Sequence, residues 1–177
     1  MMALWLRPDP LLALDNGIFI QDAHLIWRSD QPTLSADIQY RLGQELIGAL
    51  EGGIPLTLSI TLKLQESRPW WPDATLISES RRIELRYQPL TKVFQIADLE
   101  SGATQSFATL ATVVDTLSRV RGWQLKSTPV LDAKKNYIGS LKMALDVESL
   151  PLPLRIQAHI SPDWRLHTPT YSWPVKP

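Results

Sequence analysis

Hydrophobic and polar residues alternate strictly in one stretch of the chain, and this alternation predicts its strongest strand. Over residues 56–64 every second residue is leucine or isoleucine, and the residues between them are threonine, serine or lysine. A period of two places all the apolar side chains on one face of an extended strand. The same alternation predicts strands with one buried face in three further segments: Leu34–Tyr40, Leu141–Val147 and Leu154–Ile160.

Four weaker strands are predicted beside these segments. They cover Phe19–Trp27, Ile77–Tyr87, Val93–Leu99 and Tyr171–Val175. Strands with a single apolar face are typical of antiparallel sheets, because the buried strands of parallel sheets are apolar almost throughout. We therefore expect a mainly β protein whose fold is an antiparallel β-sandwich or half-barrel.

Two segments depart from this period and predict two short helices packed on the sheets. Apolar residues in Leu110–Val120 recur at spacings of three and four, with Thr109 placed as the N-cap and Gly122 just past the end. The second segment, Gln44–Glu51, is followed by two glycines, which commonly end a helix. Apolar stripes this narrow usually pack on the parent sheet, and membrane binding or partner binding is the alternative.

The length and the opening residues of the chain bear on its organisation. A chain of 177 residues is in the range of one domain and can bury a core without disulfides or metal. We assign residues 1–17 to an N-terminal arm, ordered or disordered, and residues 18–177 to a single β-rich domain. The apolar run at 11–14 is too short for a signal peptide. No window holds the roughly 20 apolar residues of a transmembrane segment.

Composition and charge exclude several classes of partner and chemistry. The 18 basic and 18 acidic residues give zero net charge, so the positive field of a nucleic-acid-binding protein is missing. Cysteine is absent, which excludes disulfides and thiolate catalysis. The three histidines, His24, His159 and His167, have no second ligand at a metal-binding spacing. We expect surface histidines, with His159 on the polar face of its strand, and neither a metal nor a cofactor.

Recognisable catalytic motifs are also missing, so we expect a non-catalytic domain. The sequence contains no Gly-x-Ser-x-Gly elbow, no phosphate-binding glycine loop and no His-Glu-x-x-His motif. An enzyme with an unrecognised carboxylate site is kept as an alternative, because four aspartates could meet in the fold. These are Asp22, Asp73, Asp98 and Asp163.

The densest unusual feature is a loop with two adjacent tryptophans between prolines. Residues 68–73 read Arg-Pro-Trp-Trp-Pro-Asp and follow the strongest predicted strand. Two indoles in such a loop can stack on a sugar, anchor a protein interface or contact a membrane. They can also plug the open end of a sandwich, where burial stabilises each by roughly 1.5–3 kcal/mol. We expect the plug, with Trp71 more exposed than Trp70, and keep both indoles and Asp73 as candidate binding residues.

A charged stretch on the next predicted strand adds further candidates. Arg81 lies on the apolar face of this strand, where a charge must reach the rim or find a partner. Glu79, two residues before it on the same face, is the expected partner. The alternative is a site for an anion or a peptide carboxylate. Arg82 points to the opposite face, so we expect that the two arginines do not form one clamp, and we keep all three residues as binding candidates.

Several short motifs, taken in order, resemble a known family. They are Trp-Trp-Pro-Asp at 70–73, Arg-Arg-Ile-Glu-Leu-Arg-Tyr at 81–87, Ser-Phe-Ala-Thr-Leu at 106–110, Arg-Gly-Trp at 121–123 and Leu-Pro-Leu-Pro-Leu-Arg at 150–155. Their order resembles an uncharacterised proteobacterial family known only as a domain of unknown function. The resemblance extends from about Ile18 to Val175.

The resemblance implies an envelope role but no activity, cofactor or site residue. Members of that family look like exported envelope proteins with an N-terminal signal, and they tend to be encoded beside a sensor kinase of the nitrogen-regulation type. A periplasmic location and a partner such as an envelope protein or a sensor-kinase ectodomain follow from the resemblance. Because residues 1–16 show no such signal, a cytoplasmic location is the alternative.

The functional expectation is therefore a non-catalytic envelope domain that binds a protein partner. The first alternative is a ligand-binding module, in which Trp70, Trp71 and the surroundings of Arg81 hold a sugar, a lipid or a small anion. The second alternative is an enzyme that uses a carboxylate site.

Overall fold

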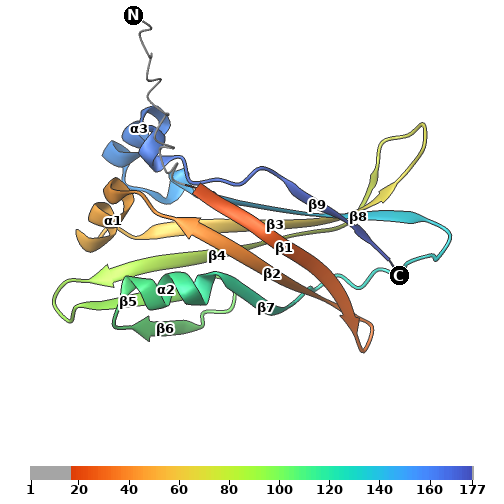
Figure 1. Ribbon diagram of the computed structural model, residues 1–177, viewed down its shortest axis with the longest axis horizontal. Helices are drawn as coiled ribbons and strands as arrows, with labels where there is room; N and C mark the ends of the chain where they lie inside the picture. The colour runs from red at the N-terminus through yellow and green to blue at the C-terminus, as the bar shows by residue number, and fades with distance from the viewer. Residues whose placement is uncertain (1–16, 177) are drawn as a thin grey trace, which may run out of the picture.

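The computed structural model describes residues 17–176, which form two antiparallel sheets with helices at their margins (Figure 1). The predicted N-terminal arm lies outside the described residues except for Gly17, which begins the first strand. The mainly β, antiparallel architecture predicted from the alternation is confirmed. Within residues 17–176 the two sheets do not join into a closed barrel.

The smaller sheet has three strands in the order β1-β2-β7. Its strands are β1 (Gly17–Arg28), β2 (Gln31–Arg41) and β7 (Arg119–Gln124). A two-residue turn joins β1 to β2, and both of its residues, Ser29 and Asp30, have positive φ angles. Turns of this kind match the right-handed twist of paired strands, which explains how β1 and β2 stay paired almost to their ends.

The larger sheet has six strands, and every neighbouring pair in it is antiparallel. In spatial order they are β6 (Thr104–Phe107), β5 (Val93–Asp98), β4 (Ala74–Gln88), β3 (Leu56–Ser67), β8 (Asn136–Leu145) and β9 (Tyr171–Val175). The alternating segment that gave the strongest prediction is therefore a central strand of this sheet.

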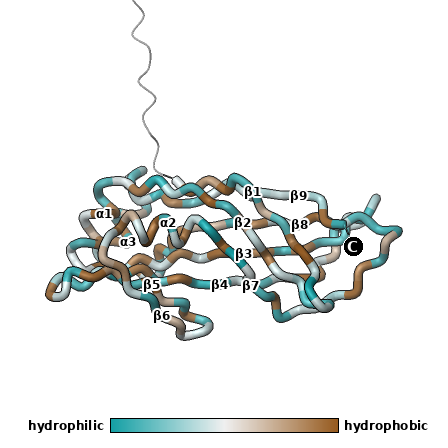
Figure 2. Tube along the Cα trace, turned by 60° about the horizontal axis from the view of Figure 1, so that its bottom comes forward, coloured by the Kyte–Doolittle hydropathy of each residue, from teal (hydrophilic) through white to brown (hydrophobic). Residues whose placement is uncertain are grey.

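The core lies between the two sheets and is lined by the alternating apolar residues. Along β3 the side chains of Leu58, Ile60 and Leu62 are buried, whereas Lys63 is exposed, as the period of two predicts. Hydrophobic and hydrophilic positions alternate along the strands in Figure 2. β1 contacts β8 and β9, so the two sheets approach each other along that margin.

Two of the helices connect one sheet to the other, and the third lies in the chain between two strands of the larger sheet. The helical elements are α1 (Gln44–Glu51), α2 (Leu110–Leu117), α3 (Leu152–Ile160) and two short 3₁₀ turns, η1 (Val147–Ser149) and η2 (Pro162–Trp164). The predicted helix at Gln44–Glu51 is confirmed with its bounds. α2 contacts β5 and β6 of the larger sheet and β7 of the smaller one, so it bridges them.

The prediction of a strand at Leu154–Ile160 is wrong, because this segment forms α3. Proline favours the first turn of a helix, and Pro153 is at that position. Only Ala158 of α3 is buried, so the alternation in the sequence does not correspond to a buried face. His159 lies in the last turn of this helix and not on a strand. The described chain thus has three α-helices where the sequence predicts two.

The predicted helix at Leu110–Val120 begins as expected but ends early. The hydroxyl of Thr109 accepts a hydrogen bond from the backbone N–H of Thr112 at 3.3 Å, which confirms the N-cap. The helix ends at Leu117, and Ile38 of β2 donates a hydrogen bond to the carbonyl of Ser118. Pairing with β2 thus draws the following residues into β7. The last two residues of the predicted strand Leu141–Val147 likewise lie outside β8, and Val147 begins η1.

Candidate functional site

The tryptophan loop forms the tip of the hairpin between β3 and β4, which projects from one end of the molecule (Figure 1). Trp70 is 98% exposed and Trp71 is 76% exposed. The prediction that these indoles plug the sandwich is wrong, and so is the prediction that Trp71 is the more exposed. The two strands stay paired out to Glu66 and Ala74, so they carry the loop beyond the end of the core.

The conformation of the tip is fixed by the backbone. The backbone N–H of Arg68 donates to Asp73 Oδ1 at 3.2 Å, so Asp73 closes the loop. Trp70 has a φ of +76°, in the left-handed region that is rare for a bulky residue. Such a conformation costs roughly 1–3 kcal/mol and persists only where the surroundings impose it. The hairpin therefore holds an exposed indole in a strained conformation.

Ionic contacts stabilise the base of the hairpin. Glu66 on β3 binds Lys135 at 3.1 Å and Arg68 at 3.3 Å. The pKa of Glu66 is lowered chiefly by the hydrogen bond from Lys135, with Arg68 adding to the effect. Lys135 precedes β8, so these contacts link the hairpin to the loop between β7 and β8. The charges near the indoles are largely paired as a result.

Arg81 lies on the face of β4 that is turned toward the smaller sheet, opposite Ile60 of β3. Its partner is Asp98 at the end of β5: the distance from Asp98 Oδ2 is 2.8 Å to Nε and 2.5 Å to Nη2. The prediction that Glu79 pairs with Arg81 is wrong. Glu79 instead accepts hydrogen bonds from the backbone N–H groups of Lys126 and Ser127 at 2.8 and 2.9 Å.

Asp98 is held ionised by its neighbours. Burial alone would raise the pKa of its carboxyl group, but hydrogen bonds from Ser101 and Arg81, joined by the backbone of Glu100, lower it to about 2. Arg82 pairs with Glu100, which accepts from its backbone N–H at 2.6 Å and from Nε at 3.2 Å. The two adjacent arginines thus have separate partners, and they do not form one clamp.

A depression of about 450 Å³ opens between β4, β5 and β7 and contains two of the predicted site residues, Glu79 and Arg81. Trp123 of β7 lines the same depression, and the guanidinium carbon of Arg81 lies 6.0 Å from its ring centroid. Trp123 is not identifiable as a site residue from the sequence, because no pattern there predicts β7. The Arg-Gly-Trp motif at 121–123 was the only signal in this part of the chain.

The predicted site residues therefore fall into two separate places. Trp70, Trp71 and Asp73 are at the hairpin tip, and neither indole lines the larger depressions of the described surface. From Ala74 to Arg81 the extended strand spans about 23 Å at roughly 3.3 Å per residue. A single pocket that combines the tryptophan pair with Arg81 is not formed.

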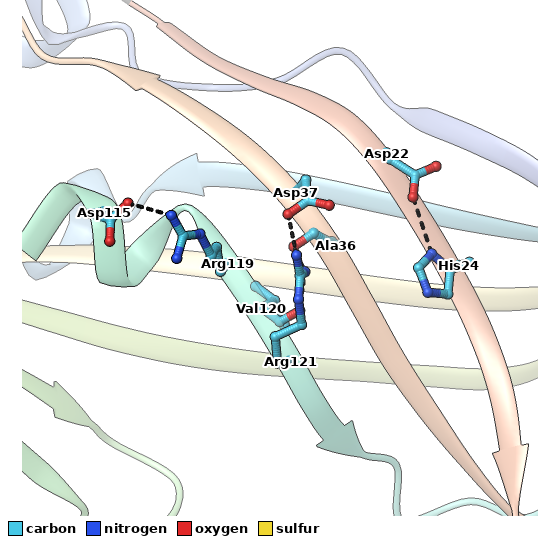
Figure 3. A network of polar contacts seen from close by, with 8 residues as sticks. All are labelled: Asp22, His24, Ala36, Asp37, Asp115, Arg119, Val120 and Arg121. Carbon is cyan, nitrogen blue, oxygen red and sulfur yellow. Dashed lines mark hydrogen bonds and ion pairs between the residues drawn. The ribbon is translucent and has the colours of Figure 1, made fainter.

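The histidines and aspartates do not assemble a metal centre among the described residues. His24 and Asp22 of β1 pair at 3.1 Å on the exposed face of the smaller sheet (Figure 3). On the same sheet Arg121 of β7 binds Asp37 of β2 and the carbonyl of Ala36. The other aspartates considered above have different surroundings: Asp73 closes the hairpin tip, Asp98 binds Arg81 and Asp163 lies in η2.

Among the described helices, none combines the length and apolar character that crossing a bilayer would require.

Comparison with known proteins identifies the family of the chain. Neither a curated protein nor a solved structure matches the chain. A family model described as a domain of unknown function, DUF4390, matches residues 15–174. The chain therefore belongs to the DUF4390 family, as the order of its motifs indicated at the level of a domain of unknown function.

Proposed function

We propose that this domain is a non-catalytic binding module, and that it docks onto a protein partner through the tip of the β3–β4 hairpin. The observation that carries the proposal is the exposure of both indoles, Trp70 at 98% and Trp71 at 76%. Location in the periplasm of a proteobacterium, with an envelope protein or a sensor-kinase ectodomain as the partner, rests on the family resemblance of the sequence.

Exposed indoles at a fixed tip are suited to protein recognition. Tryptophan is enriched among the few interface residues that contribute most of a binding free energy. Its side chain has only two rotatable bonds, so little conformational entropy is lost when it is immobilised. Asp73 closes the loop through a hydrogen bond to the backbone of Arg68, and the tip presents both indoles outward. A projecting tip of this kind fits a pocket on a partner.

The charges around the tip favour a protein over a lipid surface. Glu66 contacts both Lys135 and Arg68 at the base of the hairpin and offsets one of their two positive charges. Asp73 adds a negative charge beside the indoles. Attraction to the anionic lipids of a membrane requires an excess of basic residues near the inserted aromatic groups. A pocket on a protein partner imposes no such requirement.

The experiment is an affinity capture that compares matched variants of the full chain. Tagged wild type, Trp70→Ala, Trp71→Ala and Leu90→Ala are used to capture proteins from the native envelope, and the reproducible partner is then purified for direct binding. Leu90 is 99% exposed in the turn between β4 and β5, so its replacement removes an equally exposed apolar side chain elsewhere.

The proposal predicts that the purified partner binds wild type and Leu90→Ala alike, and that it binds either tryptophan variant at least about tenfold more weakly. A partner that binds all four proteins equally would contradict docking through the tip. Flotation of the wild type with vesicles of phosphatidylethanolamine and phosphatidylglycerol, lost in the tryptophan variants, would assign the tip to a lipid surface instead.

A further inference from the structure

The depression between the two sheets has the size and position of a small-molecule site. Its volume of about 450 Å³ lies within the roughly 300–1,000 Å³ that is usual for such sites. It opens where β7 of the smaller sheet faces β4 and β5 of the larger one. The side chains that matter for its chemistry are Glu79, Arg81, Asp98, Trp123, Gln124 and Lys126.

The lining of this depression holds three carboxylates and two cations, and a third cation just outside it brings the sum of charges to zero, which disfavours an ion as the ligand. Asp98 binds Nε and Nη2 of Arg81, so the charge of the guanidinium is already offset by a carboxylate. Glu100, in the loop after β5, is the third carboxylate of the lining and is bound by Arg82. Glu79 and Lys126 then contribute one charge of each sign. A neutral ligand meets no electrostatic penalty here.

Polar groups without a partner remain available around the rim. The Gln124 amide, the Lys126 ammonium group and the Ser80 hydroxyl make no side-chain hydrogen bond or ion pair within residues 17–176. Of the two carboxylate oxygens of Glu79, Oε1 accepts hydrogen bonds from the backbone N–H groups of residues 126 and 127, and Oε2 accepts none within residues 17–176. The rim therefore offers both donors and acceptors to a ligand.

Trp123 brings an indole ring to the lining among these polar groups. Its side chain is half-buried against the core, and the guanidinium carbon of Arg81 lies over the ring at 6.0 Å from its centroid. A sugar ring has an apolar face of C–H groups that packs on an indole, and hydroxyl groups at its edge that both donate and accept hydrogen bonds. Its lack of charge matches the cancelled charges of the site.

We propose that the depression between β4, β5 and β7 binds a neutral saccharide, with a sugar ring on Trp123 and its hydroxyl groups hydrogen-bonded to Glu79, Gln124 and Lys126. This site is separate from the hairpin tip. The proposal therefore does not depend on the protein-docking function, and each can fail without the other.

The test is a titration of the isotope-labelled full chain followed by protein NMR. The probes are glucose, galactose, N-acetylglucosamine and their β-1,4-linked trimers, with inorganic phosphate and acetate as anionic probes. We expect one of the saccharides to bind with a Kd in the millimolar range or tighter, and to shift the amide signals of Ser80, Gln124 and Lys126. Signals from the hairpin tip at 68–73 should stay in place.

Matched variants separate binding from folding. Gln124→Ala and Lys126→Ala alter exposed side chains, and each should weaken saccharide binding by about tenfold while the spectrum stays folded. Gln39→Ala and Lys134→Ala, which alter exposed residues outside the depression, should bind like wild type. Trp123→Phe keeps a ring in the core and should also weaken binding. Shifts caused only by phosphate or acetate, or no shift with any saccharide, would overturn the proposal.

Discussion

The tip that precedes β4 and the middle of this strand differ in how far unusual side chains are exposed to solvent. At its beginning, the strand carries a tip whose indoles contact solvent, with Trp70 in a strained backbone conformation. Further along, the same strand turns the charged Arg81 toward the interior, where Asp98 compensates the charge. The first region exposes groups that folding usually buries, and the second partly withdraws from solvent a group that folding usually exposes.

The fold requires the ion pair of the second region but not the indoles of the first. The Arg81 guanidinium is partly withdrawn from water and is paired with the buried Asp98, so removal of either partner should destabilise the sandwich. The exposed indoles contribute little to packing, and the left-handed φ of Trp70 opposes stability. Features that a fold does not need are the ones to test for binding. Substitutions should therefore affect stability strongly in the interior and weakly at the tip.

The largest effect is expected from a core position on β3. Ile60 is 1% exposed and lies between β4 and β8. Ile60→Ala should lower the free energy of unfolding by roughly 2–5 kcal/mol, because it removes buried area and leaves a cavity. Chemical denaturation measures the change. A loss below about 1 kcal/mol would show that this side chain does not pack in the core.

A glycine on β8 should give the next largest effect. A Cβ atom at Gly139 would lie 2.6 Å from the indole of Trp173 on β9, so the ring would have to move. Gly139→Ala should therefore destabilise the protein by roughly 1–3 kcal/mol, as overpacking does. The double variant Gly139→Ala/Trp173→Leu separates the clash from other causes. If the alanine costs as much in that background as in the wild type, the indole is not its cause.

The ion pair in the interior predicts a pH dependence in the acid range. The pKa of Asp98 falls from 3.8 to about 2 on folding, so its stabilising contribution is full above the unfolded pKa and is lost as the pH falls toward 2. The contribution is roughly 2 kcal/mol. Asp98→Asn should lower stability at pH 7 and should flatten the decline of stability between about pH 5 and pH 2. An unchanged acid profile would contradict this role.

The smallest effect on stability is expected at the tip. Trp71→Ala should change the free energy of unfolding by no more than about 0.5 kcal/mol, because the side chain is exposed. Trp70→Gly should leave stability equal or slightly higher, because glycine accepts a positive φ without strain. Urea denaturation of both variants beside wild type gives the answer. A loss of several kcal/mol in Trp71→Ala would mean that the indole is buried after all.

The sequence predicts the sheets better than the ends of the elements. Period-two alternation identifies β3 because every second residue must enter one core. The same alternation at Leu154–Ile160 does not correspond to a strand. Pro153 favours the first turn of a helix, and the segment forms α3. The end of α2 depends on pairing with β2, which is distant in the chain. Local patterns cannot show such long-range competition.

The candidate site is less predictable than the fold for a related reason. The sequence identifies Arg81 as an unusual charge on an apolar face, but its partner Asp98 is 17 residues away. The pairing of Ile83 with Asp98 places that carboxylate beside the guanidinium. Exposure of Trp70 likewise depends on how far the hairpin extends beyond the core. Both facts depend on the register between strands, which a single sequence does not reveal.

We expect the tip to bind a partner without supporting the fold. The most direct measurement determines, on Trp70→Ala/Trp71→Ala and on wild type, both the free energy of unfolding and the Kd for the purified partner. We predict an unfolding free energy within about 1 kcal/mol of wild type, together with a Kd raised at least about thirtyfold, as for the loss of an interface hot spot of roughly 2 kcal/mol. An unchanged Kd, or a loss of several kcal/mol of stability, would contradict the claim.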